Sequence, residues 1–302
     1  MSVAVAGGFG GLGRAIVEAI LAQGKHEAKP DLKTSARVAV VDYSSVASLT
    51  AVLEEHAVHT VISAVNNITG DNSSETNLIH AAEAAKTVKR FMPSYFGAHY
   101  SSEQYKSFPP AMAKKAAQAE LEASSLEWTT VYNGYFLDYF GTPKAKSYID
   151  DIAFFIDVAN DTAAIPGSGN TPVVFTHTFD VAKFVAAAID LPEWSRESYI
   201  IGDKLSWNEL LQLAQEVKGT KFHVAYDSVE KLETGIMTEL PSHQQFYAVY
   251  PKEHLQSFMS AFGVNCERGQ ANFSPSRTLN DEFPEIHAMT AREVLEIGWG
   301  KE

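Results

Sequence analysis

Seven residues near the N-terminus have the composition of a phosphate-binding turn. Gly7, Gly10 and Gly13 follow the apolar residues 3–6 and open a segment with helical character. Glycines between a strand and a helix let the backbone approach a pyrophosphate closely, and the helix N-terminus supplies amide donors and a favourable dipole. The sequence therefore predicts cofactor pyrophosphate contacts at Gly7, Phe9, Gly10, Gly11, Leu12 and Gly13. Gly7, Gly11 and Gly13 also satisfy a second glycine spacing, so the turn alone does not choose a subfamily.

The elements that must position this turn alternate between strands and helices. Strands are expected at residues 3–6, 36–41, 60–64, 90–93 and 128–132, and helices at about 12–23, 46–56, 76–86 and 109–124. This rhythm is typical of the α/β class, here a Rossmann-type doubly wound parallel sheet. Beyond residue 135 the pieces become shorter and less regular. We expect a dinucleotide-binding Rossmann domain at 1–135 and a smaller α+β substrate-binding lobe at 136–302 that partly completes the Rossmann sheet.

Composition excludes several classes of partner. The net charge of -13, with no basic run longer than Lys114 and Lys115, argues against nucleic acid. Cys266 is the only cysteine, so no thiolate cluster can hold a metal, and His56 and His59 have no carboxylate ligand nearby. Neither a signal peptide nor a membrane span is predicted. We expect a cytoplasmic protein without metal or membrane partner.

Two common catalytic patterns are missing from the sequence. None of the 12 tyrosines has a lysine four residues later, which is the acid–base pair of the better-known short-chain dehydrogenases. No G-x-S-x-G elbow is present for a serine hydrolase mechanism. Another arrangement must therefore carry any chemistry.

A set of motifs resembles the NmrA-like and isoflavone-reductase-like branch of atypical short-chain dehydrogenases, especially its fungal members. The resembling stretches are residues 7–13, 90–97, Lys114 with 121–122 and 128–129, 133–136 and 179–182. The resemblance spans most of the chain. It implies an NADP-dependent oxidoreductase that uses NADPH to reduce a small aromatic or secondary-metabolite substrate.

The resemblance also implies site residues. In the reductases of this branch a lysine on the long helix acts in catalysis, and the landmarks around it place that lysine at Lys114, where it also contacts the cofactor. A lysine with a lowered pKa can donate a proton or polarise a carbonyl, whereas a solvated lysine like Lys115 is the ordinary alternative. The nicotinamide is expected near Ala64, Val65, Asn66 and Ser94. The substrate pocket is expected at Tyr95, Phe96, Asn133, Tyr135 and Phe136.

The sequence departs from this branch at two places. Tyr95 stands where the reductases have a glutamate, so a carboxylate near the nicotinamide is missing at that position. The second strand, which ends in an arginine that grips the 2′-phosphate of NADP, is shortened or missing around 25–37, where only Lys29, Lys33 or Arg37 could replace the charge.

Asp42 has two interpretations. If residues 36–41 take the place of the second strand, Asp42 lies at the adenosine ribose and favours NAD. Its distance from Gly13 exceeds the usual spacing of about 20 residues. We therefore prefer residues 36–41 as the third strand, with Asp42 near the adenine.

The sequence leaves two functions open. The first is an NAD(P)H-dependent reductase whose partner is a small-molecule substrate. Only in this case is the chain an enzyme. The second is a non-catalytic regulator that senses the dinucleotide and binds a partner protein, as NmrA-like proteins do. A third reading of the missing strand is a truncated form that binds cofactor poorly.

Overall fold

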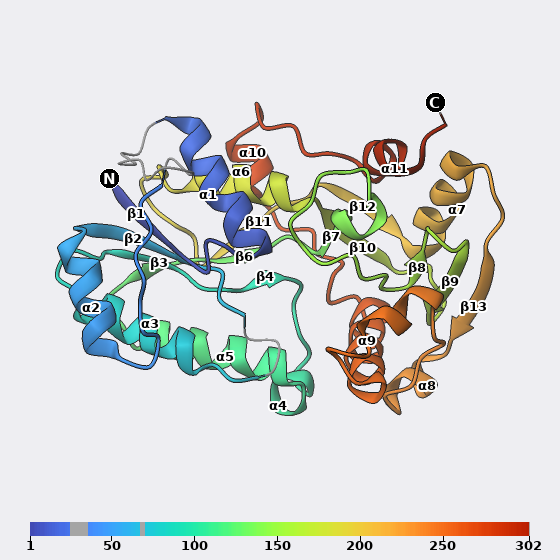
Figure 1. Ribbon diagram of the computed structural model, residues 1–302, viewed down its shortest axis with the longest axis horizontal. Helices are drawn as coiled ribbons and strands as arrows, with labels where there is room; N and C mark the ends of the chain where they lie inside the picture. Colours follow the sequence, from blue (N-terminus) through green and yellow to red (C-terminus); the bar gives the residue numbers. More distant parts are fainter. Residues whose placement is uncertain (25–35, 67–69, 302) are drawn as a thin grey trace.

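The computed structural model describes residues 1–24, 36–66 and 70–301. A parallel sheet with strand order β1-β2-β3-β5 is formed by β1 (Ser2–Ala6), β2 (Val58–Ser63), β3 (Arg90–Met92) and β5 (Glu127–Trp128). Three further parallel strands continue it in the order β11-β6-β4, namely β4 (Phe96–Gly97), β6 (Thr130–Tyr132) and β11 (Glu197–Tyr199). β4 and β6 follow β3 and β5 closely along the chain, and Figure 1 shows the two sets forming one twisted platform.

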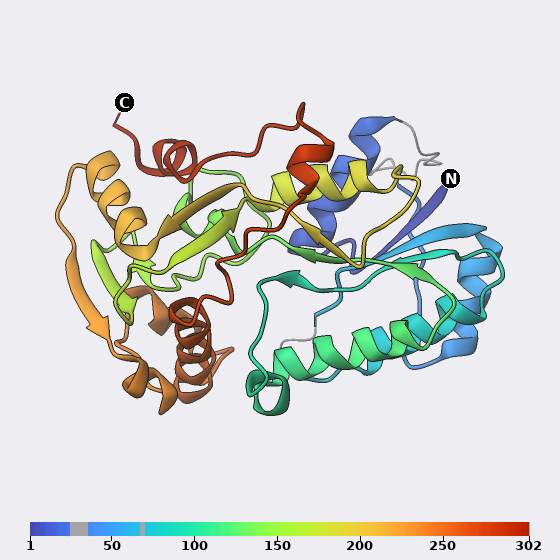
Figure 2. The same cartoon turned by 180° about the vertical axis from the view of Figure 1, so that it is seen from behind.

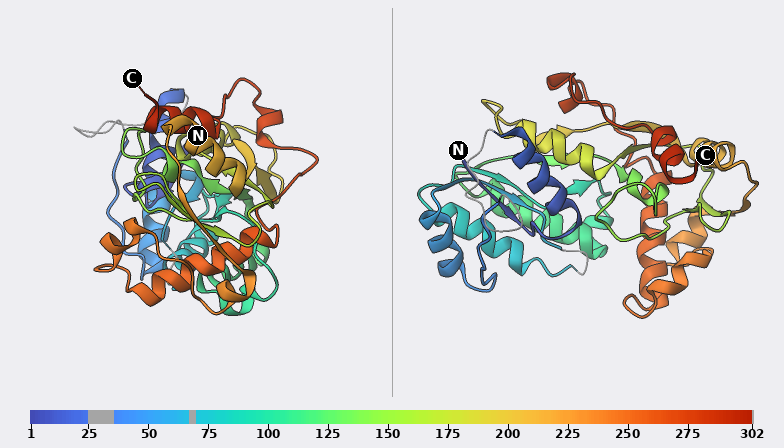
Figure 3. Two further views of the ribbon diagram at one scale, coloured as in Figure 1. Left: turned by 90° about the vertical axis from the view of Figure 1, so that its right-hand side faces the viewer. Right: turned by 45° about the horizontal axis from the view of Figure 1, so that its top comes forward.

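Helices cover both faces of this platform. One face carries α1 (Gly11–Gln23) and α6 (Thr178–Ala188), which lie side by side in the right-hand view of Figure 3. The other face carries α2 (Val46–Glu55), α3 (Ser73–Ala84) and α5 (Pro109–Glu122), which Figure 2 shows along the lower side of the sheet. Helices on both faces of a parallel sheet confirm the predicted α/β class.

Alternation along the strands explains the two helical layers. Successive side chains of a strand point to opposite faces. Ile62 and Met92 are buried with α1 and α6, whereas their chain neighbours Val61 and Phe91 are buried with α2, α3 and α5. A strand that is apolar on both faces therefore holds both layers in place.

The rest of the chain forms a second region to the right in Figure 1. Its strands are β7 (Tyr135–Phe136), β10 (Pro172–Thr176) and β12 (Asp203–Ser206) in one sheet, and β8 (Ile156–Asp157), β9 (Thr162–Pro166) and β13 (His223–Asp227) in another. Its helices are α7 (Trp207–Lys218), α8 (Val229–Glu233), α9 (Lys252–Glu267) and α11 (Ala291–Trp299). Short helices complete the fold: α4 (Gln104–Ser107), α10 (Leu279–Glu282), η1 (Leu137–Phe140) and η2 (Pro241–Phe246).

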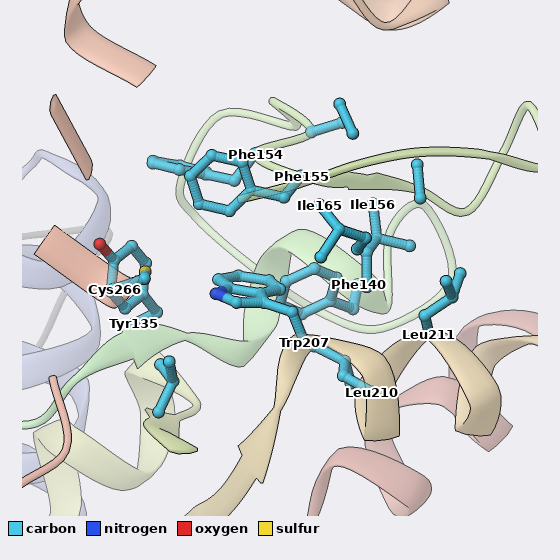
Figure 4. Close-up of a cluster of buried hydrophobic side chains, with 14 of the residues drawn as sticks. Tyr135, Phe140, Phe154, Phe155, Ile156, Ile165, Trp207, Leu210, Leu211 and Cys266 are labelled. Carbon is cyan, nitrogen blue, oxygen red and sulfur yellow. The ribbon is translucent and has the colours of Figure 1, made fainter. Parts of the chain in front are cut away.

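An aromatic core holds this second region together. The indole of Trp207 packs edge-on against Phe155 at 4.9 Å and against Phe175 at 5.2 Å between ring centroids. Figure 4 shows Trp207 at the centre of this core, with Tyr135 and Cys266 on one side. Such edge-on pairs add to the free energy gained by burying the rings.

The expected strand at residues 36–41 is wrong. These residues form no strand, and the side chains of Val38 and Val40 are 44% and 95% exposed. An apolar run becomes a strand only where a neighbouring strand pairs with it, and in the described part of the chain β1 pairs on one side alone, with β2. All five residues of β1 are accordingly only partly buried. Residues 25–35, where the shortened second strand was expected, lie outside the described residues.

His177 is the N-cap of α6. The buried carboxylate of Asp180, in the first turn of that helix, accepts from the backbone N–H of Met289 at 2.8 Å. No helix in the described ranges combines the length and apolar character that a membrane crossing requires.

Candidate functional site

The glycine turn is built by close backbone contacts that exclude side chains. Gly7 has a φ of +74°, and its carbonyl accepts from the N–H of Gly10 at 2.9 Å. A Cβ added to Gly13 would lie 2.2 Å from the Gly7 carbonyl oxygen, and one added to Gly7 would lie 2.5 Å from the Ala64 carbonyl oxygen. The strand–turn–helix arrangement predicted for this motif is therefore present.

The first amides of α1 are available to an anion. Gly10 is the N-cap of α1 and has no side chain that could cap it. The first backbone N–H groups of any α-helix have no acceptor within the helix, and the helix dipole favours a negative charge there. A pyrophosphate fits these amides, because glycine at 7 and 13 lets the backbone of the turn close tightly around the start of the helix. Phe9, by contrast, projects into solvent with 74% of its surface exposed.

Tyr43 is a neighbour of the turn that sequence reasoning missed. Half-burial raises the pKa of the Tyr43 phenol, and a hydrogen bond with the backbone of Gly7 acts in the opposite direction. The carbonyl of Tyr43 accepts from the side chain of Asn77 at 2.9 Å, which ties this loop to α3. No spacing relative to the glycines marks Tyr43 in the sequence, because the loop reaches the turn only after the chain folds back.

Asp42 does not lie at the end of a strand. Its carboxylate accepts from the backbone N–H of Ser44 at 2.9 Å and from the Ser44 hydroxyl at 2.7 Å, and these bonds lower the pKa of the Asp42 carboxyl. Such a local turn is what Asp favours before a helix, and Ser45 then caps α2. The preferred place of Asp42 at the end of a third strand is therefore wrong, and its position near the adenine stays a prediction.

The carboxyl ends of β2 and β3 meet beside the glycine turn. Ala64 donates its N–H to Ala6 at 2.9 Å, which places residues 64–66 directly against the end of β1. The Ser94 hydroxyl donates to the carbonyl of Val65 at 2.9 Å and joins the two strand ends. The structure thus brings the predicted Ala64, Val65, Asn66 and Ser94 to the edge where Rossmann-type folds bind their ligands.

Lys114 is buried rather than solvated. Only 8% of its surface is exposed, and Nζ donates to the carbonyl of Phe96 at 3.4 Å. Nζ also lies 4.7 Å from the ring centroid of Tyr95, a cation–π distance. Burial lowers the pKa of Lys114 to about 8, and the charge of Glu75 acts in the opposite direction. Lys115, the next residue, is exposed. Lys114 therefore has the lowered pKa that proton transfer near neutral pH favours.

Tyr95 lies in a closed aromatic cluster. Its surface is 0% exposed, its hydroxyl is 2.7 Å from the hydroxyl of Tyr105, and its ring packs edge-on against Tyr132 at 5.2 Å. Burial raises the pKa of the Tyr95 phenol, so the hydroxyl stays protonated. Tyr95 therefore presents its ring face, and no charge, to Lys114.

The remaining predicted pocket residues occupy different environments. Tyr135 is 5% exposed, and its hydroxyl donates to the carbonyl of Phe262 at 3.1 Å, so it is a core residue of the second region. Asn133 is fully buried, whereas Phe96 and Phe136 are partly exposed. A groove of about 900 Å³ opens beyond the aromatic cluster and is lined in part by His99, Tyr105, Gln118, Tyr132 and Tyr199. None of the five predicted pocket residues lines it.

Glu75 is the site residue that sequence reasoning missed. It lies in the first turn of α3 and is 1% exposed, and its Oε1 accepts from the backbone N–H of Ser94 at 2.6 Å. A signal existed, because Glu75, Leu78, Ile79 and Ala82 share one buried helix face, where a charged residue is out of place. In the described ranges no group of three or more His, Cys, Asp or Glu side chains could hold a metal ion.

Comparisons with known proteins agree with this architecture. Residues 1–283 match the model of the NmrA-like family. The oxidoreductase BOA1 of Botryotinia fuckeliana is 37% identical over 295 residues, which cover 94% of this chain and 95% of that protein. The oxidoreductase swnN of Metarhizium robertsii is 32% identical over 330 residues, which cover 98% and 97%.

Solved structures show the same fold. A ternary complex of leucoanthocyanidin reductase from Vitis vinifera superposes with a TM-score of 0.74 at 20% identity and covers 98% of each chain. A structure described as AtPrR2 with NADP+ and (+)pinoresinol gives a TM-score of 0.74 at 22% identity, with 98% of each chain covered. Together with the glycine cradle and the family match along most of its length, these findings establish that the chain is a member of the NmrA-like family.

Proposed function

We propose that this protein is an NADPH-dependent reductase of the isoflavone-reductase-like type, acting on a small aromatic or secondary-metabolite substrate. The observation that carries the proposal is Lys114, a buried amine held beside the strand-end residues that border the glycine turn. Two full-length relatives bear the name oxidoreductase, and two solved structures of the same fold are described with NADP+ or NADPH.

The described residues divide the work between binding and proton transfer. The glycine turn would hold the pyrophosphate, and Ala64, Val65, Asn66 and Ser94 would border the nicotinamide. The bound cofactor supplies the hydride. Lys114 would hold a proton at Nζ and give it to a substrate oxygen, and its lowered pKa makes that transfer easier than from an ordinary lysine. Residues 1–135 would carry the dinucleotide site and residues 136–302 the substrate lobe.

The choice between NADPH and NADH concerns the adenosine end. Arg37, the described candidate for the 2′-phosphate, has its guanidinium 3.8 Å from the Glu55 carboxylate and is well exposed. Lys29 and Lys33 lie outside the described residues. Both hydrogen bonds from Ser44 end on Oδ1 of Asp42, so a ribose contact through the second carboxylate oxygen stays a prediction.

Calorimetric titration of the purified protein with NADPH and NADH tests the cofactor. We expect tight binding that favours NADPH. A preference for NADH would show that the proposed choice of NADPH is wrong. If neither nucleotide binds, the proposal of a reductase is wrong.

One observation favours a second candidate, the dinucleotide-sensing regulator. Residues 36–41 form no strand, and in the described ranges β1 pairs only with β2, so no strand is seen there at the position where the arginine for the 2′-phosphate was expected. Variants of Lys114 separate the two candidates. NADPH consumption with a panel of aromatic ketones and enones should fall at least about a hundredfold in Lys114→Ala, as expected for a lost general acid, and stay unchanged in the control Lys115→Ala. Equal turnover by both variants would show a reductase that does not depend on Lys114, whereas NADPH binding without turnover by the unaltered protein would favour the regulator.

A further inference from the structure

In the described part of the chain, the ammonium of Lys114 is buried and its two direct contacts are both neutral. Its hydrogen-bond acceptor is a neutral carbonyl, that of Phe96, and its other close contact is the neutral ring of Tyr95. A buried charge needs compensation, because the loss of water around it is costly. A nearby negative charge must therefore come from another element.

Glu75 provides that charge from α3. Its carboxylate is buried, and its attraction for Lys114 partly offsets the effect of burial on the pKa of that lysine. The backbone N–H of Ser94 donates to Glu75 at 2.6 Å, while the carbonyl of Phe96 accepts from Lys114. The two charged side chains thus hold opposite ends of one three-residue stretch, with Tyr95 in its middle.

We infer that Glu75 is a positioning residue for Lys114, and that its carboxylate replaces the one that resembling reductases carry at the position of Tyr95. The ring of Tyr95 then fills the vacated space and faces the ammonium. The inference rests on the proposed function, in which Lys114 serves the reduction. It differs from a purely structural role, in which Glu75 would do no more than fix the Ser94 amide.

Few other titratable groups face Lys114. The ring of Tyr95 faces Nζ of Lys114, and the Tyr95 hydroxyl contacts the hydroxyl of Tyr105. The ring centroid of Tyr105 lies 5.5 Å from Nζ of the next residue, Lys115. The phenol of Tyr95 is neutral near pH 8, because burial raises its pKa. In the described part of the chain, Glu75 is the charged group recorded as acting on the pKa of Lys114.

The titration of Lys114 itself tests the inference and needs neither cofactor nor substrate. In protein labelled with ¹³C,¹⁵N-lysine, the Cε and Nζ resonances of Lys114 are assigned by their loss in Lys114→Met. Removing the opposite charge near a lysine lowers its pKa by at least about one unit. We therefore expect the pH midpoint of the Lys114 titration to fall by that amount in Glu75→Gln. The glutamine keeps the acceptor for Ser94. The control Glu83→Gln, an exposed residue of α3 that accepts from Ser125, should leave the transition unchanged.

A rescue variant separates charge from structure. The double variant Glu75→Gln/Tyr95→Glu should return the Lys114 transition toward its original value, because it restores one carboxylate beside the ammonium. An unchanged transition in Glu75→Gln, or no return in the double variant, would reduce Glu75 to an anchor of the Ser94 loop. If Glu75→Gln does not fold, Tyr95→Glu alone must raise the transition, and an unaltered transition there overturns the inference.

The proposed function and this inference can fail separately. NADPH binding by the unaltered protein, measured through nucleotide fluorescence, reports on the reductase. The Lys114 titration reports on Glu75. If NADPH does not bind but the Lys114 titration responds to Glu75→Gln as expected, the role of Glu75 stands and the reductase proposal is wrong.

Discussion

Gly11 and Ile149 lie so close together that no side chain fits between them. A Cβ added to Gly11 would be 2.7 Å from Cγ2 of Ile149 and 2.9 Å from the carbonyl oxygen of Tyr148. The Tyr148 hydroxyl donates to Glu18 at 2.7 Å, and the guanidinium of Arg14 covers the Tyr148 ring at 3.9 Å. The segment at residues 148–149 is thus fixed on the first turn of α1, beside the proposed pyrophosphate cradle.

Gly11→Ala should therefore disturb cofactor binding from outside the three-glycine motif. Either the 148–149 segment moves away or the first turn of α1 shifts, and in both cases the amide cradle changes shape. We expect NADPH affinity to fall about tenfold, which corresponds to ~1.4 kcal/mol. Fluorescence titration measures this loss. Gly269→Ala is the control, since its Cβ meets nothing within 4 Å and the strain from its φ of +78° falls just after α9. An equal loss of affinity there would discredit the explanation.

Arg90 should be a strong contributor to stability. Its guanidinium donates to the carbonyls of Ile189, Leu191 and Pro192 at 2.7 to 3.1 Å and to the Glu127 carboxylate at 2.6 Å. Arg90→Met would leave these acceptors without their donor, at a cost of about 3 kcal/mol in the free energy of unfolding. Urea denaturation measures it. The exposed pair of Arg292 with Glu216 supplies the control, because Arg292→Met should cost less than about 1 kcal/mol.

The low pKa of Lys114 predicts a specific dependence of stability on pH. Below pH 8 the amine is charged in both the folded and the unfolded chain, and its burial opposes folding. Between pH 8 and 10.5 the folded chain has released the proton that the unfolded chain still holds, so stability rises with pH. The free energy of unfolding, taken as the difference between the unaltered protein and Lys114→Met, should increase by roughly 3 kcal/mol over this window. A flat difference would mean that Lys114 is solvated.

Cys266 should be inert in the folded protein. It is 1% exposed, and burial raises the pKa of its thiol to about 12, so almost no thiolate exists at pH 8. A chromogenic disulfide reagent should release no colour from the native chain and one equivalent per chain after unfolding in urea. Fast reaction of the native protein would show that the core around Tyr135 and Trp207 opens.

The glycine turn could be placed from the sequence because its determinants are local. A strand, three glycines and a helix follow one another without interruption, and the φ of +74° at Gly7 is a demand that the residue type itself reveals. The helix carrying Lys114 was likewise predictable from its composition. The burial of Lys114 was not, because it depends on Phe96 and Tyr95, which reach it from another strand end.

The errors have the opposite cause. Residues 36–41 have the composition of a strand, but pairing depends on a partner beside β1 and not on the run itself. Glu75 was missed although it shares a helix face with Leu78, Ile79 and Ala82, because its partner, the backbone N–H of Ser94, comes from another strand end. The pocket role of Tyr135 stays a prediction from the resemblance, and the structure adds that its ring lies in the core of Figure 4.

The return of α6 and β11 to the first sheet has a consequence for biosynthesis. Ile16, Ile62 and Met92 are made early, but Val181 and Val185 of α6, which cover them, are made only in the second half of translation. The ribosome thus releases residues 1–135 while α1 alone covers this face of the sheet. Nascent chains stalled near residue 135 should remain protease-sensitive and bind chaperones, and the protein should acquire protection only after residue 200 has left the exit tunnel.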